Sequence, residues 1–444
     1  MTRTKRRIAL ACAALTVITV AVAAPQAGAG RPSAKPTYRT YHEPGEDPGS
    51  GEPSIGINWK TGTAMYQSGL RTLAVSWNSR GDAKWEDRSF ILESVNSLDP
   101  ILYTDGRSGR TWVSQLAANC SLLSYTDDDG RTWTPTTGCG PGAYVDHQTV
   151  GAGPFAPSPL NALTESQPAA VYYCAQAIAN ASCARSDTGG LTFGPAVPMY
   201  SITECGGLHG HLRVAPDGTV YVPHMGCGSN QAIVVSEDNG VTWDIRKIPG
   251  SKVNGESDPS VAAGSDNTTY FGYQDGADDD NTRAMIAVTR DHGKTWSKPV
   301  DVSSRLGIKN VQFPEVIAGD GDRAAFAWLG TKTGGNDQNN AFEGEWRLYV
   351  STTYDRGRTW TTVNATPTEL VQRGCIQLTG CNHRNLLDFN DISVDKQGRV
   401  YVAWADGCPR ECEKGAEWKS SWHRSVITRQ SGGKGLFRAY DGKI

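Results

Sequence analysis

Residues 126–133 read Thr-Asp-Asp-Asp-Gly-Arg-Thr-Trp, and the pattern Ser/Thr-x-Asp-x-Gly-x-Thr-Trp returns at residues 236–243, 289–296 and 353–360. A fifth stretch, residues 186–193, is a degenerate copy in which the aspartate stands one place earlier. Four matches at five fixed positions are rare by chance, so the chain contains an internal repeat. Such a repeat predicts an architecture in which similar units stack side by side.

The repeated aspartates have a structural explanation. An aspartate carboxylate in a tight turn accepts hydrogen bonds from the backbone N–H groups of that turn, and the glycine supplies a positive φ angle. The tryptophan can fill the space between neighbouring sheets. We therefore assign the aspartates of the four intact boxes to the fold and not to catalysis: Asp128, Asp238, Asp291 and Asp355.

Paired apolar stretches precede the boxes and indicate hairpins. Residues 258–264 are followed by 269–273, and residues 313–319 by 324–328, with turn residues between the members of each pair. A third strand before each box and a fourth after it give four strands per unit. Seven units can be counted, with boxes that start near residues 76, 126, 186, 236, 289, 353 and 428. This spacing predicts an all-β fold, a single β-propeller of four-stranded antiparallel blades, with seven blades preferred and six as the alternative.

The first 50 residues differ from the rest. A basic segment, an apolar segment and a small-residue cleavage site predict a secretory signal peptide over residues 1–29. Residues 30–50 are rich in Pro and Gly and are interpreted as a leader, and residues 51–444 as the propeller. We expect a secreted, soluble protein that has no membrane span and is monomeric.

Composition and charge exclude several classes of protein. The 50 glycines follow no three-residue period, which excludes collagen, and the aromatic content is too high for a disordered chain. Residues 1–29 hold four of the 43 basic residues and none of the 46 acidic ones, so the remaining chain carries a net charge of −7. A net negative charge disfavours nucleic acid as a partner.

Ten cysteines remain outside the signal peptide, an even number that is typical of disulfides in an exported chain. Short loops favour pairing between sequence neighbours, although ten cysteines allow many other connectivities. A structural zinc site at residues 408–412 is the alternative interpretation. The expected pairs are Cys120 with Cys139, Cys174 with Cys183, Cys205 with Cys227, Cys375 with Cys381, and Cys408 with Cys412.

The boxes resemble the Asp-box repeats (BNR repeats) of the secreted sialidase-like β-propeller family, over about residues 50–444. The resemblance implies a propeller that acts on glycans. It also implies an arginine in a Phe/Tyr-Arg-Ile-Pro motif before the first blade, which this sequence lacks; the nearest arginine, Arg39, stands in Tyr-Arg-Thr-Tyr. We therefore carry over none of the family's catalytic residues.

The expected fold indicates where a site should lie. In such propellers, the loops that lead into the first strand of each blade meet around one end of the central axis, where ligands usually bind. Carboxylates and imidazoles are frequent at these positions, which are Glu52, Asp99, Asp146, His147, His209, His211, Glu256, Asp258, Glu315, Asp388 and Asp391.

Three of these carboxylates are our candidate catalytic residues: Asp99, Asp258 and Glu315. Carboxyl pairs cleave glycosidic bonds, one as the acid and the other as the base or nucleophile. The alternative is that each carboxylate caps a turn. The candidate substrate-binding residues are Arg213, His211, His147 and Tyr273, although Arg213 could instead form an ion pair with Asp258.

His209 and His211 are separated by one residue, and in a strand such residues point to the same face. Two imidazoles on one face are a possible metal site, with Ca²⁺ or Zn²⁺ as candidate ions. Two neutral, hydrogen-bonded histidines are the simpler interpretation, and we expect no cofactor.

Three functions fit these features. The first is a secreted sialidase-like glycoside hydrolase, an exo-glycosidase that acts on an extracellular glycan or glycoconjugate through carboxylates at the rim. The second is a non-catalytic propeller that binds glycan or protein. The third is a polysaccharide lyase with a His/Tyr/Arg site.

Overall fold

A computed structural model describes most of the chain after the predicted signal peptide, and the described part lies within one compact unit, Ser33–Ile444. The described residues are 35–45, 50–91, 97, 99–117, 120–137, 144–159, 166–376, 381, 384–408, 412 and 423–444.

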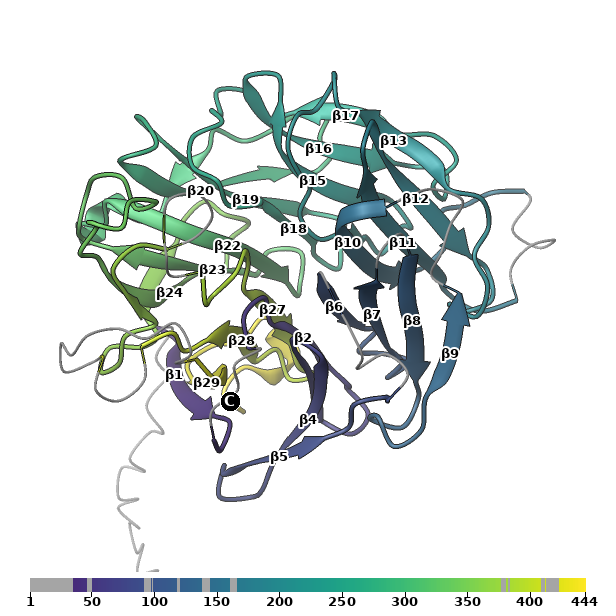
Figure 1. Ribbon diagram of the computed structural model, residues 1–444, viewed down its shortest axis with the longest axis horizontal. Helices are drawn as coiled ribbons and strands as arrows, with labels where there is room; N and C mark the ends of the chain where they lie inside the picture. Colours follow the sequence, from purple (N-terminus) through teal and green to yellow (C-terminus); the bar gives the residue numbers. More distant parts are fainter. Residues whose placement is uncertain are drawn as a thin grey trace, which may run out of the picture. The chain divides into compact units, whose positions relative to one another are not determined.

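Seven antiparallel sheets surround a common centre and form a seven-bladed β-propeller (Figure 1). The prediction of seven blades is confirmed. The first blade comprises β2 (Ser54–Ile57), β3 (Ala64–Ser68), β4 (Arg71–Trp77) and β5 (Ala83–Asp87). The second comprises β6 (Pro100–Thr104), β7 (Thr111–Ala117), β8 (Cys120–Thr126) and β9 (Thr134–Thr137). The third comprises β10 (Tyr144–Gly153), β11 (Ala170–Ala177), β12 (Asn180–Ser186) and β13 (Val197–Ser201).

The next two blades repeat the same order. The fourth comprises β14 (Arg213–Val214), β15 (Val220–Cys227), β16 (Asn230–Ser236) and β17 (Asp244–Lys247). The fifth comprises β18 (Ser260–Ala263), β19 (Thr269–Gly276), β20 (Thr282–Thr289) and β21 (Val300–Asp301).

The last two blades depart slightly from this pattern. The sixth comprises β22 (Asn310–Ala318), β23 (Ala324–Thr331), β24 (Glu345–Thr353) and β25 (Thr361–Asn364), and the short strand β26 (Gln372–Arg373) also pairs with β24. The seventh comprises β27 (Asp391–Val394), β28 (Val400–Ala405), β29 (Ser425–Gly432) and β1 (Thr37–His42). Two short 3₁₀ turns lie at Ser304–Leu306 and Arg438–Tyr440.

The seventh blade is completed by the N-terminal strand. β1 pairs antiparallel with β29, so that Tyr41 stands opposite Ile427. β1 therefore closes the ring between the two ends of the propeller. It lies within residues 30–50, which the sequence analysis places in a leader, so the propeller extends back to residue 37.

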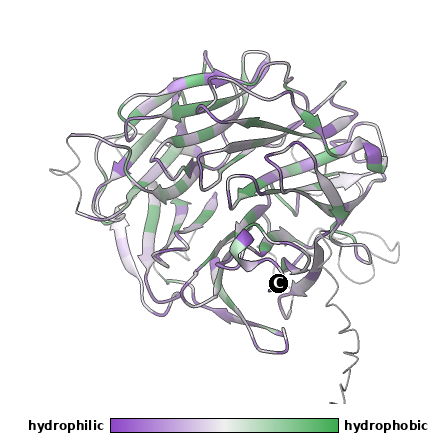
Figure 2. Ribbon diagram, turned by 180° about the vertical axis from the view of Figure 1, so that it is seen from behind, coloured by the Kyte–Doolittle hydropathy of each residue, from purple (hydrophilic) through white to green (hydrophobic). Residues whose placement is uncertain are grey.

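Hydrophobic residues concentrate in the strands, and the connecting loops are more hydrophilic (Figure 2). Large aromatic rings fill the space between blades. Trp328 and Trp404, for example, are fully buried. Trp328 stacks on Tyr349 with ring centroids 4.7 Å apart. Such aromatic packing makes a large contribution to core stability.

The four intact boxes form the same turn between the third and fourth strands. In the fourth blade, Asp238 Oδ1 accepts a hydrogen bond from the backbone N–H of Thr242 (2.9 Å), and Asp238 Oδ2 accepts one from its hydroxyl (2.6 Å). Asp128, Asp291 and Asp355 make the equivalent pair of bonds. The glycine of the turn has a positive φ angle, 79° at Gly240.

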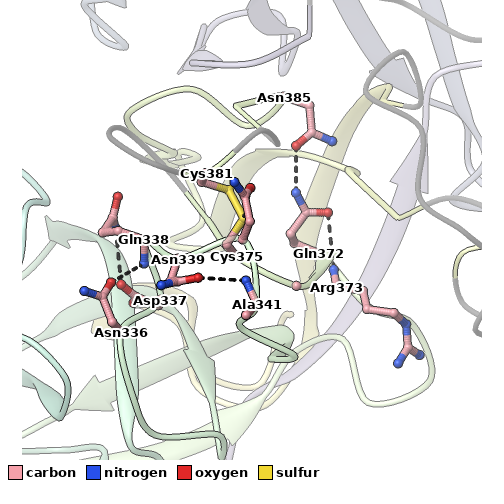
Figure 3. Close-up of a disulfide and its surroundings, with 12 residues drawn as sticks. Asn336, Asp337, Gln338, Asn339, Ala341, Gln372, Arg373, Cys375, Cys381 and Asn385 are labelled. Carbon is pink, nitrogen blue, oxygen red and sulfur yellow. Dashed lines mark hydrogen bonds between the residues drawn. A yellow bond between two sulfur atoms is a disulfide. The ribbon is translucent and has the colours of Figure 1, made fainter.

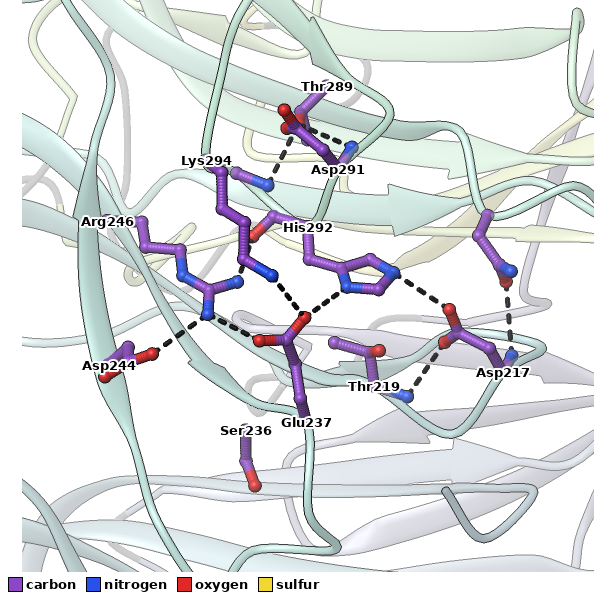
Figure 4. A network of polar contacts seen from close by, with 12 residues as sticks. Asp217, Thr219, Ser236, Glu237, Asp244, Arg246, Thr289, Asp291, His292 and Lys294 are labelled. Carbon is purple, nitrogen blue, oxygen red and sulfur yellow. Dashed lines mark hydrogen bonds and ion pairs between the residues drawn. The ribbon is translucent and has the colours of Figure 1, made fainter. Parts of the chain in front are cut away.

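Polar contacts around the boxes also join neighbouring blades (Figure 4). His292, in the box of the fifth blade, contacts Asp217 (2.9 Å) and Glu237 (2.5 Å), both from the fourth blade. Arg246 approaches the other oxygen of Glu237 at 2.7 Å. The box end of the propeller is therefore occupied by structural contacts.

Four of the five expected disulfides are present, and the Cys139 partner of the fifth lies outside the described residues. The four are Cys174–Cys183, Cys205–Cys227, Cys375–Cys381 (Figure 3) and Cys408–Cys412. The last of these occupies the place of the alternative zinc site. Among the described residues, none of the helices has the length and apolar character needed to cross a membrane.

Candidate functional site

A cavity of about 210 Å³ lies between the first strands of all seven blades. In Figure 1, the labelled first strands β2, β6, β10, β18, β22 and β27 are those nearest the centre. The cavity wall combines aliphatic side chains with polar ones, and the titratable residues that line it are Tyr103, Asp105, Arg107, His211, Arg213 and Asp391. A cavity in which polar groups converge among apolar side chains is the usual form of a small-molecule site.

Titratable side chains from all seven blades meet beside this cavity, and each interacts electrostatically with at least one other. We call this group the axial cluster. It consists of Glu52, Asp99, His147, His209, His211, Arg213, Asp258, Glu315 and Asp391. The structure thus brings together every residue that the sequence analysis proposes for catalysis, substrate binding or metal binding, apart from Tyr273.

Two members of the cluster are held in place by irregularities in the backbone of their strands. β10 shifts register between Asp146 and Thr149, and His147 there has a φ angle of 45°. β22 shifts register between Gln312 and Glu315. Such bulges re-aim side chains in a strand, and they account for the position of His147 and Glu315 at the axis.

His147 and Asp258 form the central contact of the cluster. His147 Nδ1 lies 3.0 Å from Asp258 Oδ2, and the two side chains are 12% and 14% exposed. Burial would lower the pKa of His147, but the charge of Asp258 raises it well above its usual value. Burial would likewise raise the pKa of Asp258, but His147 holds it below its usual value. The pair is therefore an imidazolium and a carboxylate at neutral pH.

Asp99 also interacts electrostatically with His147 and has the opposite protonation behaviour. Its Oδ2 accepts a hydrogen bond from the backbone N–H of Gln148 at 2.8 Å. Burial raises the pKa of Asp99 to about 7, against the opposing effect of His147. Asp99 is therefore a carboxylic acid that can hold its proton up to neutral pH.

Glu315 and Asp391 form a second carboxyl pair. Ser260 Oγ donates to Glu315 Oε2 at 2.9 Å, and Arg213 Nη2 donates to Asp391 Oδ1 at 3.2 Å. Burial raises the pKa of Glu315 well above its usual value, and the charge of Asp391 raises it further. Burial also raises the pKa of Asp391, to about 6, against the effect of Arg213. Arg213 thus pairs with Asp391, and not with Asp258 as one of our alternatives held.

The two histidines of the His-Gly-His segment are both neutral. Burial lowers the pKa of His209 to about 4 and that of His211 to about 3. His211 packs edge-on against Phe389, with ring centroids 4.5 Å apart. His209 Nδ1 lies 3.0 Å from the carbonyl oxygen of Gly210, and its Nε2 is buried without a hydrogen-bond partner among the described residues.

Tyr273 does not belong to the site. It lies in β19, the second strand of its blade, and its side chain is fully buried in an inter-blade core with Phe271 and Tyr221. The structure therefore does not retain it as a substrate-binding residue. Aromatic residues of second strands face the neighbouring blade, whereas substrate would meet the starts of first strands.

Glu52 and Asp391 are members of the cluster that our choice of candidates missed. Both stand where a first strand begins, the same signal that selected Asp99 and Asp258. Burial raises the pKa of Glu52 well above its usual value, and nearby Asp99 raises it further. The start of a first strand is therefore the feature that all these residues share in the sequence.

No family model matches the sequence, and no curated protein matches it. Solved structures with a similar arrangement include a GH74 enzyme of Niastella koreensis, at 17% identity and a TM-score of 0.49; the match covers 84% of this chain and 52% of that one. YCF48 of Cyanidioschyzon merolae matches at 11% identity and a TM-score of 0.48, over 89% of this chain and 98% of that one. A sialidase of Trypanosoma rangeli matches at 14% identity and a TM-score of 0.36, over 85% and 58%. These similarities concern the fold alone.

Proposed function

We propose that this protein is a glycoside hydrolase whose acid is Asp99 and whose base or nucleophile is Asp258. One observation carries the proposal: two buried carboxyl groups both interact with His147, and their pKa values are displaced in opposite directions. Environments that separate two such pKa values assign the acid and the base.

Cleavage of a glycosidic bond needs this division of roles. A carboxylic acid protonates the leaving oxygen, while a carboxylate attacks the anomeric carbon or activates a water molecule. Asp99 holds a proton near neutral pH and can donate it. Asp258 is ionised, and its Oδ2 faces His147, which fixes its orientation. Among the described residues, Oδ1 of each aspartate accepts no hydrogen bond.

The charge of the cluster bears on the substrate. Recognition of sialic acid requires several arginines around one carboxylate, but the axial cluster holds a single arginine, Arg213, already paired with Asp391. We therefore propose that the terminal sugar is uncharged, which narrows the sialidase-like activity expected from the sequence to neutral glycans.

The site of action follows from the leader and the disulfides. The predicted signal peptide directs export, and four disulfides are typical of proteins in oxidising compartments. We infer that the substrate is an extracellular glycan or glycoconjugate.

A panel of 4-methylumbelliferyl glycosides tests the proposal. The wild-type protein should release the fluorophore from at least one neutral sugar and not from the sialoside. Asp99→Asn and Asp258→Asn should lower kcat by about 10²–10⁴-fold. Asp244→Asn, an exposed aspartate on the box end, is the matched control and should keep full activity. Inactivity of the wild type on the whole panel, or full activity of both variants, would overturn the proposal in favour of a binding function.

A further inference from the structure

Three side chains from three different blades place metal-ligating atoms next to one another at the axial cavity. His211 precedes the first strand of the fourth blade, Glu315 lies in that of the sixth, and Asp391 begins that of the seventh. One nitrogen of His211 and one oxygen each of Glu315 and Asp391 all lie within 4.8 Å of one another. Zn²⁺ holds such ligands at about 2.0–2.2 Å, so ligands of one ion stand roughly 3–4 Å apart. Small side-chain rotations bring this set to that spacing.

His211 has no other use for its ring nitrogens. Neither nitrogen has a hydrogen-bond partner among the described residues, and the ring is held by its edge-on contact with Phe389 (4.5 Å). The side chain lines the axial cavity together with that of Asp391. A neutral imidazole that lines a cavity and has no protein partner for its nitrogens can offer one of them to a metal ion.

The two carboxylates are held in place by neighbouring groups. Ser260 Oγ donates to Glu315 Oε2 and accepts from the backbone N–H of Val316 at 3.0 Å. Asp391 Oδ2 accepts from the backbone N–H of Ile55 at 2.8 Å, and its Oδ1 accepts from Ile392 and Arg213. Metal-binding sites use such outer hydrogen bonds to orient their ligands. Glu315 Oε1 accepts no hydrogen bond among the described residues, and Asp391 Oδ2 retains a second lone pair.

The ligand types favour one class of ion. Ca²⁺ takes six to eight oxygen ligands, whereas imidazole combined with carboxylates suits first-row transition metals and zinc. Three protein ligands leave at least one coordination position open, as in catalytic zinc sites. That position would face the axial cavity, which His211 and Asp391 line.

We propose that His211, Glu315 and Asp391 bind one divalent transition metal ion, with Zn²⁺ as the probe, at the axial cavity. The proposal differs from the pair His209 and His211 considered from the sequence, because His209 turns Nδ1 to the backbone of Gly210. It does not rest on glycoside hydrolysis, since metal binding is measured without substrate.

The test is calorimetric titration of the full-length mature protein with ZnCl₂ after removal of metal by a chelator, with metal content measured by mass spectrometry. We expect one Zn²⁺ per chain. Loss of a hydrogen bond to a metal ligand already lowers metal affinity by about 10–100-fold. His211→Ala removes a ligand itself, so it should lower the affinity for Zn²⁺ by more than about 100-fold. Glu315→Gln keeps the side-chain shape and an acceptor for Ser260, and it should weaken binding while the circular dichroism spectrum stays native.

His292→Ala is the control, because this histidine lies in a box and not in the axial cluster. It should bind Zn²⁺ as tightly as the wild type. Absence of stoichiometric binding to the wild type, or binding that survives both His211→Ala and Glu315→Gln, would overturn the proposal. Either result leaves the hydrolase proposal to be decided by the glycoside panel.

Discussion

His147 of the third blade lies 3.0 Å from Asp258 of the fifth, so this ion pair spans the intervening fourth blade. Both side chains are largely buried, and each holds the other in its charged form. The contact joins parts of the ring that are not sequence neighbours, and it sits at the centre of the proposed catalytic group.

Removal of His147 should therefore destabilise the fold as well as the site. His147→Ala leaves the Asp258 carboxylate buried without its cation, and breaking a buried pair in this way costs about 3–5 kcal/mol. Urea denaturation followed by tryptophan fluorescence measures the loss. Lys84→Ala breaks the exposed pair with Glu86 and should cost less than about 1 kcal/mol. Equal losses in the two variants would show that the His147–Asp258 pair is not structural.

Activity should depend on the protonation of Asp99. Burial raises the pKa of Asp99 to about 7, so the proton needed for leaving-group protonation is present below that pH. The value of kcat should fall as the pH rises through about 7, by tenfold per pH unit once the proton is lost. A pH–rate profile on an active neutral glycoside checks this. A profile that stays flat between pH 6 and 9 would contradict the role of Asp99.

His224 should make the fold sensitive to acid. Its side chain is fully buried, Nε2 has no hydrogen-bond partner among the described residues, and burial lowers its pKa to about 3. The group is neutral in the folded state, so its contribution is complete above the unfolded pKa of about 6.5. Below that pH the free energy of unfolding should fall by about 1.4 kcal/mol per pH unit, down to about pH 3.

Thermal unfolding between pH 7 and 4 measures this acid sensitivity. His224→Phe keeps an aromatic ring against Tyr200, whose ring centroid lies 4.8 Å from that of His224. As the pH falls from 7 to 4, the melting temperature of this variant should fall less than that of the wild type. An identical fall in melting temperature with pH in the wild type and in His224→Phe would refute the role given to His224.

The degenerate box of the third blade offers a stabilising substitution. Thr188 stands where the intact boxes have aspartate, and its single hydroxyl oxygen bonds to both the backbone N–H (2.9 Å) and the hydroxyl (3.0 Å) of Thr192. Thr188→Asp supplies a second oxygen, so that each donor of Thr192 has its own acceptor, and it should raise stability by about 0.5–1 kcal/mol, in the range of consensus substitutions. The reverse change, Asp238→Thr, should lower the free energy of unfolding by a similar amount. A higher melting temperature for Thr188→Asp is the expected readout, and a lower one would contradict this account of the box.

The fold was predictable because its signal is local and repeated. Each box encodes its own turn within eight residues, and the turn of Asp238 and Thr242 is the one that the sequence implies. β1 escaped prediction because its partners are distant: Thr40 bonds to Thr428, 388 residues away. No local pattern in residues 37–42 marks them as the last strand of the seventh blade.

The sequence predicted where the residues of the candidate site lie, but not which of them contact one another. The repeat placed Asp99, Asp258 and Glu315 around one end of the axis, and they do meet there. The pairing of Arg213 with Asp391 links the fourth and seventh blades, so it depends on how the closed ring sets the distance between them. The raised pKa of Asp99 depends on burial, which the sequence does not reveal.

The position of β1 also constrains how the molecule is assembled. The seventh sheet combines residues from opposite ends of the fold, so the ring stays open until β27, β28 and β29 are present and β1 docks beside them. Contacts of such large sequence separation are slow to form, because the intervening chain must first be ordered. The axial cluster draws Glu52 from the first blade and Asp391 from the last, and Asp391 Oδ2 bonds to Ile55 across that junction. Ring closure would thus be the step that creates the site, so a chain cut short before β29 would hold most of its blades and still have no functional centre.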